Sequence, residues 1–313
     1  MSARSRQGDD RPDPNLNAIM SERRQLINLA YRLLGSLADA EDVVQETYVR
    51  WYAMTPAQQR AIASPGGWLT KVTSRICLDL LGSARARREN YVGEWIPEPL
   101  PDRMEWSDGC SQGTADPAER VTLDESVNMA FLVVLESLTP AERVAFILHD
   151  VFRYPFTDIA DIVGRTPGAC RQLATSARRR IRGSRAPARS GERQAAVIRS
   201  FKQAWEAKDI GALIGLLDPG AESVADSGGL VEAGSHAVRG PAQIARGLVA
   251  LVRRLPELTI LERMVNGQPG LVVQQDGVTV TVVAFEVARE RVVRIWAVRN
   301  PDKLQPWRAA PRP

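Results

Sequence analysis

The stretch FTDIADIVGRTPGACRQLATSARRRIRG, residues 156–183, has the spacing of two short helices joined by a tight turn. The first helix has an apolar side formed by Ile159, Ala160 and Val163. Gly164 supplies the turn, Thr166 is a natural N-cap, and Pro167 is a natural first residue of the second helix. The second helix carries an apolar stripe of Cys170, Leu173, Ala174, Ala177 and Ile181. The pattern predicts a helix-turn-helix.

The remaining positions of the second helix are polar and basic. The candidate DNA contacts are Arg165, Thr166, Arg171, Gln172, Thr175, Ser176, Arg178 and Arg179. Guanidinium and amide groups suit base edges in a major groove, and hydroxyls and further arginines suit phosphates. A solvated basic helix end, favoured by the helix dipole, explains Arg178–Arg182 equally well. It does not explain the paired helices, the turn and the cap, so DNA binding is the favoured interpretation.

An acidic helix lies near the start of this mildly basic chain, in DAEDVVQETYVRWY (39–52). Its candidate contact residues are Asp39, Glu41, Asp42, Gln45 and Glu46. Compensation of the helix dipole would suffice to explain Asp39, Glu41 and Asp42. An acidic face is poorly suited to phosphates. The exposed side of this helix is therefore predicted to dock on a basic protein surface.

A basic helix follows, in WLTKVTSRICLDLLGSARARR (68–88), after the polar loop MTPAQQRAIASPGG (54–67). Its cations are Lys71, Arg75, Arg85, Arg87 and Arg88. Single-stranded nucleic acid needs such a cationic track beside platforms for unstacked bases. Core packing is the simpler account of Trp68, and a solvated helix end is the alternative for Arg85–Arg88.

The rest of the chain adds a different kind of unit. After Arg193, helical patterns give way to alternating strands, of which VTVTVVAFEV (278–287) is the clearest, and this predicts a compact α+β domain. A net charge of +4 is by itself weak evidence for a polyanionic partner. Three widely spaced cysteines indicate neither a zinc site nor a disulfide framework, and they favour a reduced, cytoplasmic compartment. Neither a secretory signal nor a membrane span is predicted.

Three segments resemble a known family in the family's own order. DAEDVVQETYVRWY, GGWLTKVTSRICLDLL and LTPAERVAFILHDVFRYPFTDIADIVGRTPGACRQLATSARRRIR look like regions 2 and 4 of extracytoplasmic-function sigma factors. WIPEP (95–99), DSGGL (226–230) and NPDKL (300–304) resemble the subgroup with a SnoaL-like C-terminal extension, the SigJ type. The resemblance implies a multidomain fold, with two all-α sigma domains followed by an α+β SnoaL-like cone domain.

The resemblance also implies partners. The acidic helix would dock on the β′ clamp helices of core RNA polymerase, and region 4 would reach the β flap. Region 2 would read the −10 promoter element through its basic helix, and region 4 would read the −35 element. The C-terminal domain would regulate these regions in cis. The residues implied in that contact are Trp95, Pro97, Glu98, Pro99, Asp226, Gly228, Gly229, Asn300, Pro301, Asp302 and Lys303.

These predictions together define the expected domain organisation of the chain. The predicted units are a disordered tail (1–20), a region 2 domain (21–92), a flexible linker with WIPEP (93–118), a region 4 domain (119–183), a short linker (184–192), a SnoaL-like domain (193–305) and a tail (306–313). The free chain is expected to be a monomer without metal, cofactor or membrane partner.

Two alternatives remain open on the residues alone. One is a helix-turn-helix regulator with a ligand-sensing C-terminal domain, which would not need the acidic helix. The other is an enzyme of the SnoaL type, which would use an acid–base pair in its cavity. We interpret His149 as a structural histidine and His236 as a loop residue. Asp226 has no acid–base partner at a suitable spacing in the sequence. Catalysis is therefore not expected. Phe201, Trp205 and Trp296 are expected to be core residues.

Overall fold

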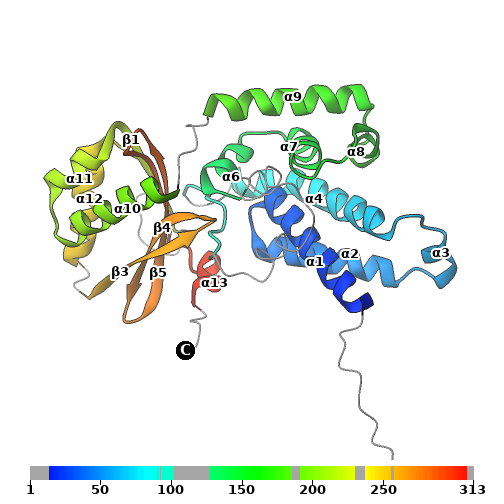
Figure 1. Ribbon diagram of the computed structural model, residues 1–313, viewed down its shortest axis with the longest axis horizontal. Helices are drawn as coiled ribbons and strands as arrows, with labels where there is room; N and C mark the ends of the chain where they lie inside the picture. The colour runs from blue at the N-terminus through cyan, green and yellow to red at the C-terminus, as the bar shows by residue number, and fades with distance from the viewer. Residues whose placement is uncertain are drawn as a thin grey trace, which may run out of the picture.

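The computed structural model describes residues 14–89, 91, 93–101, 127–184, 191–229, 237–254 and 257–308, with side chains placed in these ranges except at 14–21, 84–89, 183 and 184. Two groups of helices lie on one side of the molecule, and a sheet with its own helices lies on the other (Figure 1). We call these groups the first helical domain (α1–α4), the second helical domain (α6–α9) and the C-terminal domain (α10–α13).

The first helical domain comprises α1 (Pro14–Leu34), α2 (Leu37–Tyr52), α3 (Pro56–Arg60) and α4 (Pro65–Glu89). Gly35 ends α1 with a φ of 70°, a left-handed conformation that favours glycine. The hydroxyl of Ser36 accepts a hydrogen bond from the Asp39 amide at 3.2 Å and so caps α2. The apolar side chains of α1 between Leu26 and Leu34 are buried.

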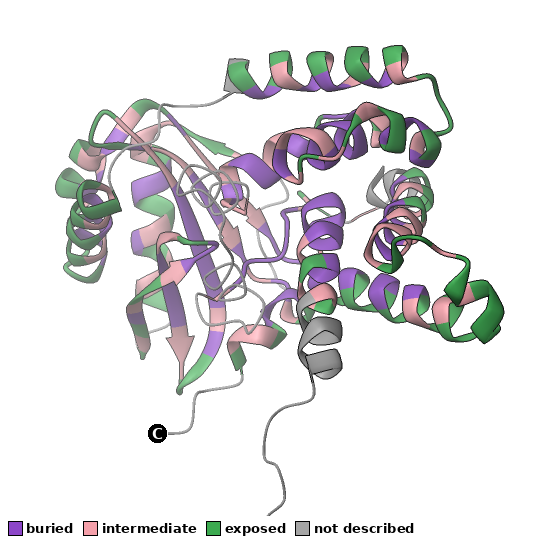
Figure 2. Cartoon of the chain, turned by 45° about the vertical axis from the view of Figure 1, so that its right-hand side comes forward, coloured by how far each residue is buried: buried purple, intermediate pink, exposed green. Residues whose placement is uncertain are grey.

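The second helical domain confirms the helix-turn-helix pattern. Its elements are α6 (Met129–Glu136), α7 (Pro140–Phe146), the π-helical turn η2 (Ile147–Val151), α8 (Phe156–Val163) and α9 (Pro167–Ser184). Gly164 ends α8 in the left-handed region with a φ of 70°, and Thr166 accepts a hydrogen bond from the Ala169 amide at 3.2 Å. Helix α9 is exposed along its outer side (Figure 2).

The two helical domains share one hydrophobic core. A single cluster of buried side chains includes Leu33 of α1, Val44 of α2, Cys77 of α4, Ile147 of η2 and Ile159 of α8. The sequence suggested two separate helical domains. Their apolar faces instead cover each other, so one core spans both domains.

The C-terminal domain is built on a six-stranded sheet. Its helices are α10 (Gly191–Glu206), α11 (Ile210–Leu216), α12 (Pro241–Arg254), η3 (Pro301–Leu304) and α13 (Gln305–Arg308). Its strands are β1 (Leu217–Asp226), β2 (Val238–Arg239), β3 (Leu258–Val265), β4 (Gln268–Gln275), β5 (Val278–Ala288) and β6 (Arg291–Val298). The strand order is β2-β1-β6-β5-β4-β3. Neighbouring strands pair antiparallel except β1 and β6, which are parallel.

Both faces of this sheet are apolar. Helices α10, α11 and α12 cover one face, where Phe201, Trp205 and Phe285 fill the space beneath them. The other face packs against residues from outside the domain, including Ile96 and Met129, and against Leu304 of η3. Trp296 belongs to this second cluster, whereas Phe201 and Trp205 belong to the first, and all three are buried core residues as expected. The second face joins the C-terminal domain to the helical domains.

Residues 95–101, which we call the strap, run between the C-terminal domain and the helical domains. The sequence suggested a flexible linker, but Ile96 through Leu100 are buried. Their order has a physical cause, because partners on both sides take up their backbone groups. Two further boundaries differ from expectation: α1 already begins at Pro14, and α13 occupies part of the expected tail. Residues 1–13 and 102–126 lie outside the described residues.

Candidate functional site

The exposed side of α2 carries the predicted acidic face. Asp39, Glu41, Asp42, Gln45 and Glu46 are all exposed. The opposite side is buried through Leu37, Ala40, Val43, Val44 and Thr47. The helical period therefore separates a packing face from a polar one. Glu46 pairs with Arg50 one turn later at 2.8 Å, whereas the other carboxylates face outward.

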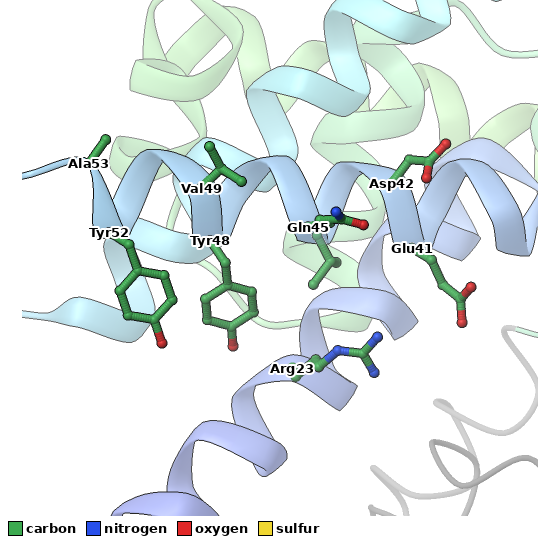
Figure 3. Close-up of a pocket in the computed structure, with 9 residues that line it drawn as sticks. Arg23, Glu41, Asp42, Gln45, Tyr48, Val49, Tyr52 and Ala53 are labelled. Atoms are coloured by element: carbon green, nitrogen blue, oxygen red, sulfur yellow. The ribbon is translucent and has the colours of Figure 1, made fainter.

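Beside this face lies a groove of about 750 Å³ between α1 and α2. It is lined by Arg23, Glu41, Asp42, Val44, Gln45, Tyr48, Val49, Tyr52 and Ala53. Figure 3 shows Tyr48, Val49 and Tyr52 following one another along α2, with Arg23 on α1 across from them. Val49 is 56% exposed and Tyr52 66% exposed, which is unusual for large apolar side chains. The surface is thus acidic at one end and aromatic at the other.

Sequence reasoning found the acids of this groove but missed its aromatic end. Tyr48 is half-buried, and its ring stacks on that of Tyr52 with the ring centroids 6.2 Å apart. The helical period alone places Tyr48 beside Val44 and gives no sign that α1 leaves the ring uncovered.

Two of the cations predicted to meet the −10 element, Lys71 and Arg75, contact the second helical domain. Lys71 Nζ lies 2.9 Å from the Asp161 carboxylate of α8, and Arg75 donates to the Asp161 carbonyl at 2.7 Å. The pKa of Asp161 lies below its ordinary value because Lys71 hydrogen bonds to its carboxylate. The side chains of Arg85, Arg87 and Arg88 lie outside the described residues. Trp68 packs on Trp51, with ring centroids 5.3 Å apart.

Helix α9 presents most, but not all, of its predicted contacts outward. Arg165, Thr166, Arg171, Gln172, Thr175 and Arg179 are exposed. Ser176 and Arg178 are half-buried instead, because Ser176 donates to Glu142 at 2.7 Å and Arg178 pairs with Asp150 at 2.8 Å. These two residues brace α9 against α7 and η2.

A buried polar cluster joins the C-terminal domain to the strap. Asp226, at the end of β1, is 0% exposed, and its carboxylate accepts four hydrogen bonds. The donors are Tyr91 Oη at 2.6 Å, Lys303 Nζ at 2.7 Å, the Ile96 amide at 3.0 Å and the Gly228 amide at 3.1 Å. Lys303 also lies 4.2 Å from the Trp95 ring centroid. Burial, followed by the hydrogen bond to Asp226, raises the pKa of Tyr91 above its ordinary value.

The DSGGL and NPDKL segments meet in this cluster, where Gly228 lies against Asn300. Gly228 has a φ of 62°, and a Cβ there would lie 2.7 Å from Asn300 Nδ2, so only glycine fits without displacing Asn300. Asn300 caps η3 by accepting from the Asp302 amide at 3.0 Å, and Pro301 follows as the first residue of η3. Gly229 also has a positive φ, of 72°.

The other edge of the strap meets the first helical domain at Glu98. The Glu98 amide donates to the Gly35 carbonyl at 2.8 Å, and the Glu98 carbonyl accepts from Tyr31 Oη at 2.7 Å. Its carboxylate accepts from the Leu37 amide at 2.7 Å, at the first residue of α2. Burial raises the pKa of Glu98 to about 7, although Leu37 and Lys303 act in the opposite direction.

Several residues of this contact had no sequence signal. Asn266 Nδ2 donates to Tyr31 Oη at 2.8 Å and to the Val127 carbonyl at 2.9 Å. Trp307 Nε1 donates to the Pro99 carbonyl at 2.7 Å. A lone asparagine in a turn and a tryptophan near the end of the chain match no motif. Only their positions in the folded chain reveal their roles.

Comparison with known proteins places these surfaces in a family. Residues 18–87 match the model of Sigma-70 region 2, and residues 128–181 match that of Sigma-70, region 4. The chain is 37% identical to the ECF RNA polymerase sigma factor SigJ of Mycobacterium tuberculosis, over 90% of each chain. This chain belongs to the extracytoplasmic-function sigma factors.

A further relative and a solved structure agree with this assignment. The probable ECF RNA polymerase sigma factor SigI of Mycobacterium tuberculosis is 36% identical over 95% of this chain and 97% of its own. The crystal structure of the M. tuberculosis sigma factor SigJ superposes with a TM-score of 0.71 at 33% identity, covering 93% of this chain and 98% of the other. The sigma factor reading and the multidomain fold class expected from the sequence are thus confirmed, and the helix-turn-helix regulator alternative is disfavoured.

The structure also bears on the two histidines and on the absence of a predicted membrane span. His149 Nδ1 lies 3.0 Å from the Tyr154 carbonyl and its ring stacks on Phe156, as expected of a structural histidine. His236 lies outside the described residues. Among the described helices, none is long and apolar enough to cross a lipid bilayer.

Proposed function

We propose that this sigma factor holds core RNA polymerase through the α2 face and groove, and promoter DNA through α4 and α9. The supporting observation is the division of charge between exposed surfaces. Helix α2 presents Asp39, Glu41 and Asp42, whereas the outer side of α9 presents Arg171 and Arg179. An acidic surface repels phosphates and attracts a basic protein surface, so each helix suits one class of partner.

In this proposal the β′ clamp helices occupy the α2 surface and the second helical domain reaches the β flap. Lys71 and Arg75 serve the −10 element once they leave Asp161, and α9 serves the −35 element. The free chain is a monomer acting in the cytoplasm, without catalysis of its own.

Reconstitution with core polymerase tests this function. The chain is mixed with a promoter fork, melted at the −10 element, in the presence and absence of core polymerase, and binding is followed by fluorescence anisotropy. A sigma factor of this kind binds the fork tightly only with the polymerase. Tight binding to duplex DNA by the chain alone would instead favour a stand-alone regulator. Run-off transcription on genomic templates then identifies the promoters.

Substitutions on α9 are expected to separate base readout from phosphate binding. Arg171→Ala or Gln172→Ala is predicted to weaken promoter binding by about 1–3 kcal/mol and to relax specificity at one −35 position. Holoenzyme affinity is measured on a set of −35 variants, with Arg246→Ala on the exposed side of α12 as the control. An equal loss on every −35 sequence would assign these residues to phosphates instead.

We further propose that the C-terminal domain regulates the helical domains in cis through the strap. The supporting contacts are the Asp226 cluster on one edge of the strap and Glu98 on the other. An attached domain has a high effective concentration, so a modest interface suffices to keep the chain closed. The closed form also keeps Lys71 and Arg75 on Asp161, away from DNA.

Docking of the strap is predicted to weaken as the pH rises. The raised pKa of Glu98 means that the docked form binds a proton more tightly than the undocked form. Docking is therefore strongest below the ordinary pKa of 4.5 and is lost as the pH rises through about 7. Lys303 lowers the pKa of Glu98, and Asp39 and Glu41 raise it.

Between pH 6 and pH 8 the docking equilibrium is expected to fall about tenfold. Hydrogen exchange at the Leu37 amide, which Glu98 holds, measures the change. Glu98→Gln keeps an acceptor for this amide but cannot titrate, so its exchange should lose this pH dependence beyond the intrinsic rate. The same pH dependence in Glu98→Gln would rule out Glu98 as the titrating group.

A further inference from the structure

The strap has two edges with different chemistry, and this difference bears on how the closed form opens. Cis-regulation, on which this inference rests, requires the C-terminal domain to separate from the first helical domain. Separation has two candidate planes. The strap can remain on the first helical domain and part from the sheet, or it can remain on the sheet and part from the first helical domain.

On the sheet side the strap is held along most of its length. The Ile96 amide donates to Asp226 at 3.0 Å, and Lys303 Nζ donates to the Ile96 carbonyl at 2.5 Å. The backbone amide of Leu100 donates to Asn266 Oδ1 at 3.0 Å, and the backbone amide of Asn266 donates to the Leu100 carbonyl at 2.9 Å. Trp307 holds the Pro99 carbonyl, and Pro101 forms an antiparallel bridge with Val265. The end of the strap thus lies beside the end of β3.

Apolar packing reinforces this side. The Ile96 side chain is 1% exposed and belongs to the cluster formed by Val265, Trp296 and Leu304. Burying a side chain of this size stabilises by roughly 1.5–3 kcal/mol. The Asp226 carboxylate and the Lys303 ammonium group lie 2.7 Å apart within the C-terminal domain, and each bonds to the Ile96 backbone. Parting here would remove that backbone partner from both buried ions.

On the other side, the hydrogen bonds described between the strap and the first helical domain converge on one residue. Glu98 accepts from Tyr31 and Leu37 and donates to Gly35. The Glu98 carboxylate is held there by a backbone amide, whereas Asp226 is held by an ammonium group, a hydroxyl and two amides. The Leu100 side chain packs into the helical core. When Glu98 is released, its carboxylate is hydrated again and the free-energy cost of its burial is removed.

We propose that the strap leaves the first helical domain together with the C-terminal domain when polymerase engages α2. Parting at Glu98 frees the α1–α2 turn and the first amide of α2, one turn before Glu41. Polymerase would bind at Glu41 and the strap is released at Leu37, so both events act on the first turn of α2. The bond between Asn266 and Tyr31 breaks in the same movement.

Hydrogen exchange with residue resolution tests the plane of separation. The wild-type chain is compared free and bound to core polymerase. The amides of Leu37 and Glu98 are expected to lose protection on binding, while those of Ile96, Leu100 and Asn266 keep it. Loss of protection at Ile96, Leu100 and Asn266, or unchanged protection at Leu37 and Glu98, would overturn the proposal.

A covalent tie gives an independent test. Pro101→Cys with Val265→Cys places a cysteine pair at a described antiparallel bridge, where Cα atoms lie about 4.5–5.5 Å apart and suit a disulfide. Cys110→Ser removes a competing thiol, and each single cysteine variant serves as a control. The oxidised pair is expected to bind core polymerase within about twofold of its reduced form. A tenfold or greater loss on oxidation would show that the strap must leave the sheet.

These outcomes distinguish a failure of the docking proposal for α2 from a failure of the inferred plane of separation. If neither the reduced variant nor the wild-type chain binds core polymerase, the docking proposal fails before the strap is tested. If both bind and only the oxidised variant fails, docking stands and the inferred plane of separation is wrong.

Discussion

Asp226→Ala is expected to destabilise the contact between the C-terminal domain and the strap by about 3–5 kcal/mol. The substitution removes the acceptor of four hydrogen bonds. It also leaves the ammonium group of Lys303, a residue that is 8% exposed, without its counter-ion. An uncompensated buried charge costs more than the net value of the original pair, because desolvation of the remaining ion is no longer offset.

The change is measured as the free energy of unfolding in urea, together with the rate of proteolysis within the strap. Asp79→Ala, at an exposed position on α4, removes the same charge and is expected to change stability by less than about 0.5 kcal/mol. In the double variant Asp226→Asn, Lys303→Met the orphaned ion is gone, so much of the loss should be recovered. A loss below about 1 kcal/mol in Asp226→Ala would mean that water reaches Lys303 and that the cluster does not hold the domains together.

Charge reversal on α2 is expected to abolish holoenzyme assembly. Glu41→Arg with Asp42→Arg places two cations where a basic partner surface must dock, and like charges at an interface cost several kcal/mol. We expect the affinity for core polymerase to fall at least about 100-fold, with the largest loss at low ionic strength. Titration of labelled chain with core polymerase measures the effect.

The matched control reverses two acidic residues elsewhere. Glu192→Arg with Glu257→Arg changes the net charge equally on exposed parts of the C-terminal domain. This variant should retain its affinity within about threefold. If the α2 variant bound as tightly as this control, the acidic face would be a solubility feature and the polymerase would dock elsewhere.

Local features of the sequence predicted the elements of the helical domains well. Gly164, Thr166 and Pro167 fix the turn and the start of α9, because caps and left-handed glycines act within one turn of the backbone. The helical period also predicted which acids of α2 are exposed. The same logic failed for Ser176 and Arg178, because their partners Glu142 and Asp150 belong to other elements.

By itself, the sequence determined the helix-turn-helix, the acidic and basic faces and the α+β character of the last domain, since these follow from periodicity and from residues close together in the chain. Only the tertiary structure decided that the two helical domains share a core, that Lys71 rests on Asp161, and that the strap is buried. The bond from Asn266 to Tyr31 spans 235 residues. No local pattern encodes such a contact. It forms only when the apolar faces of the sheet and of the helices are buried against one another, which brings distant parts of the chain together.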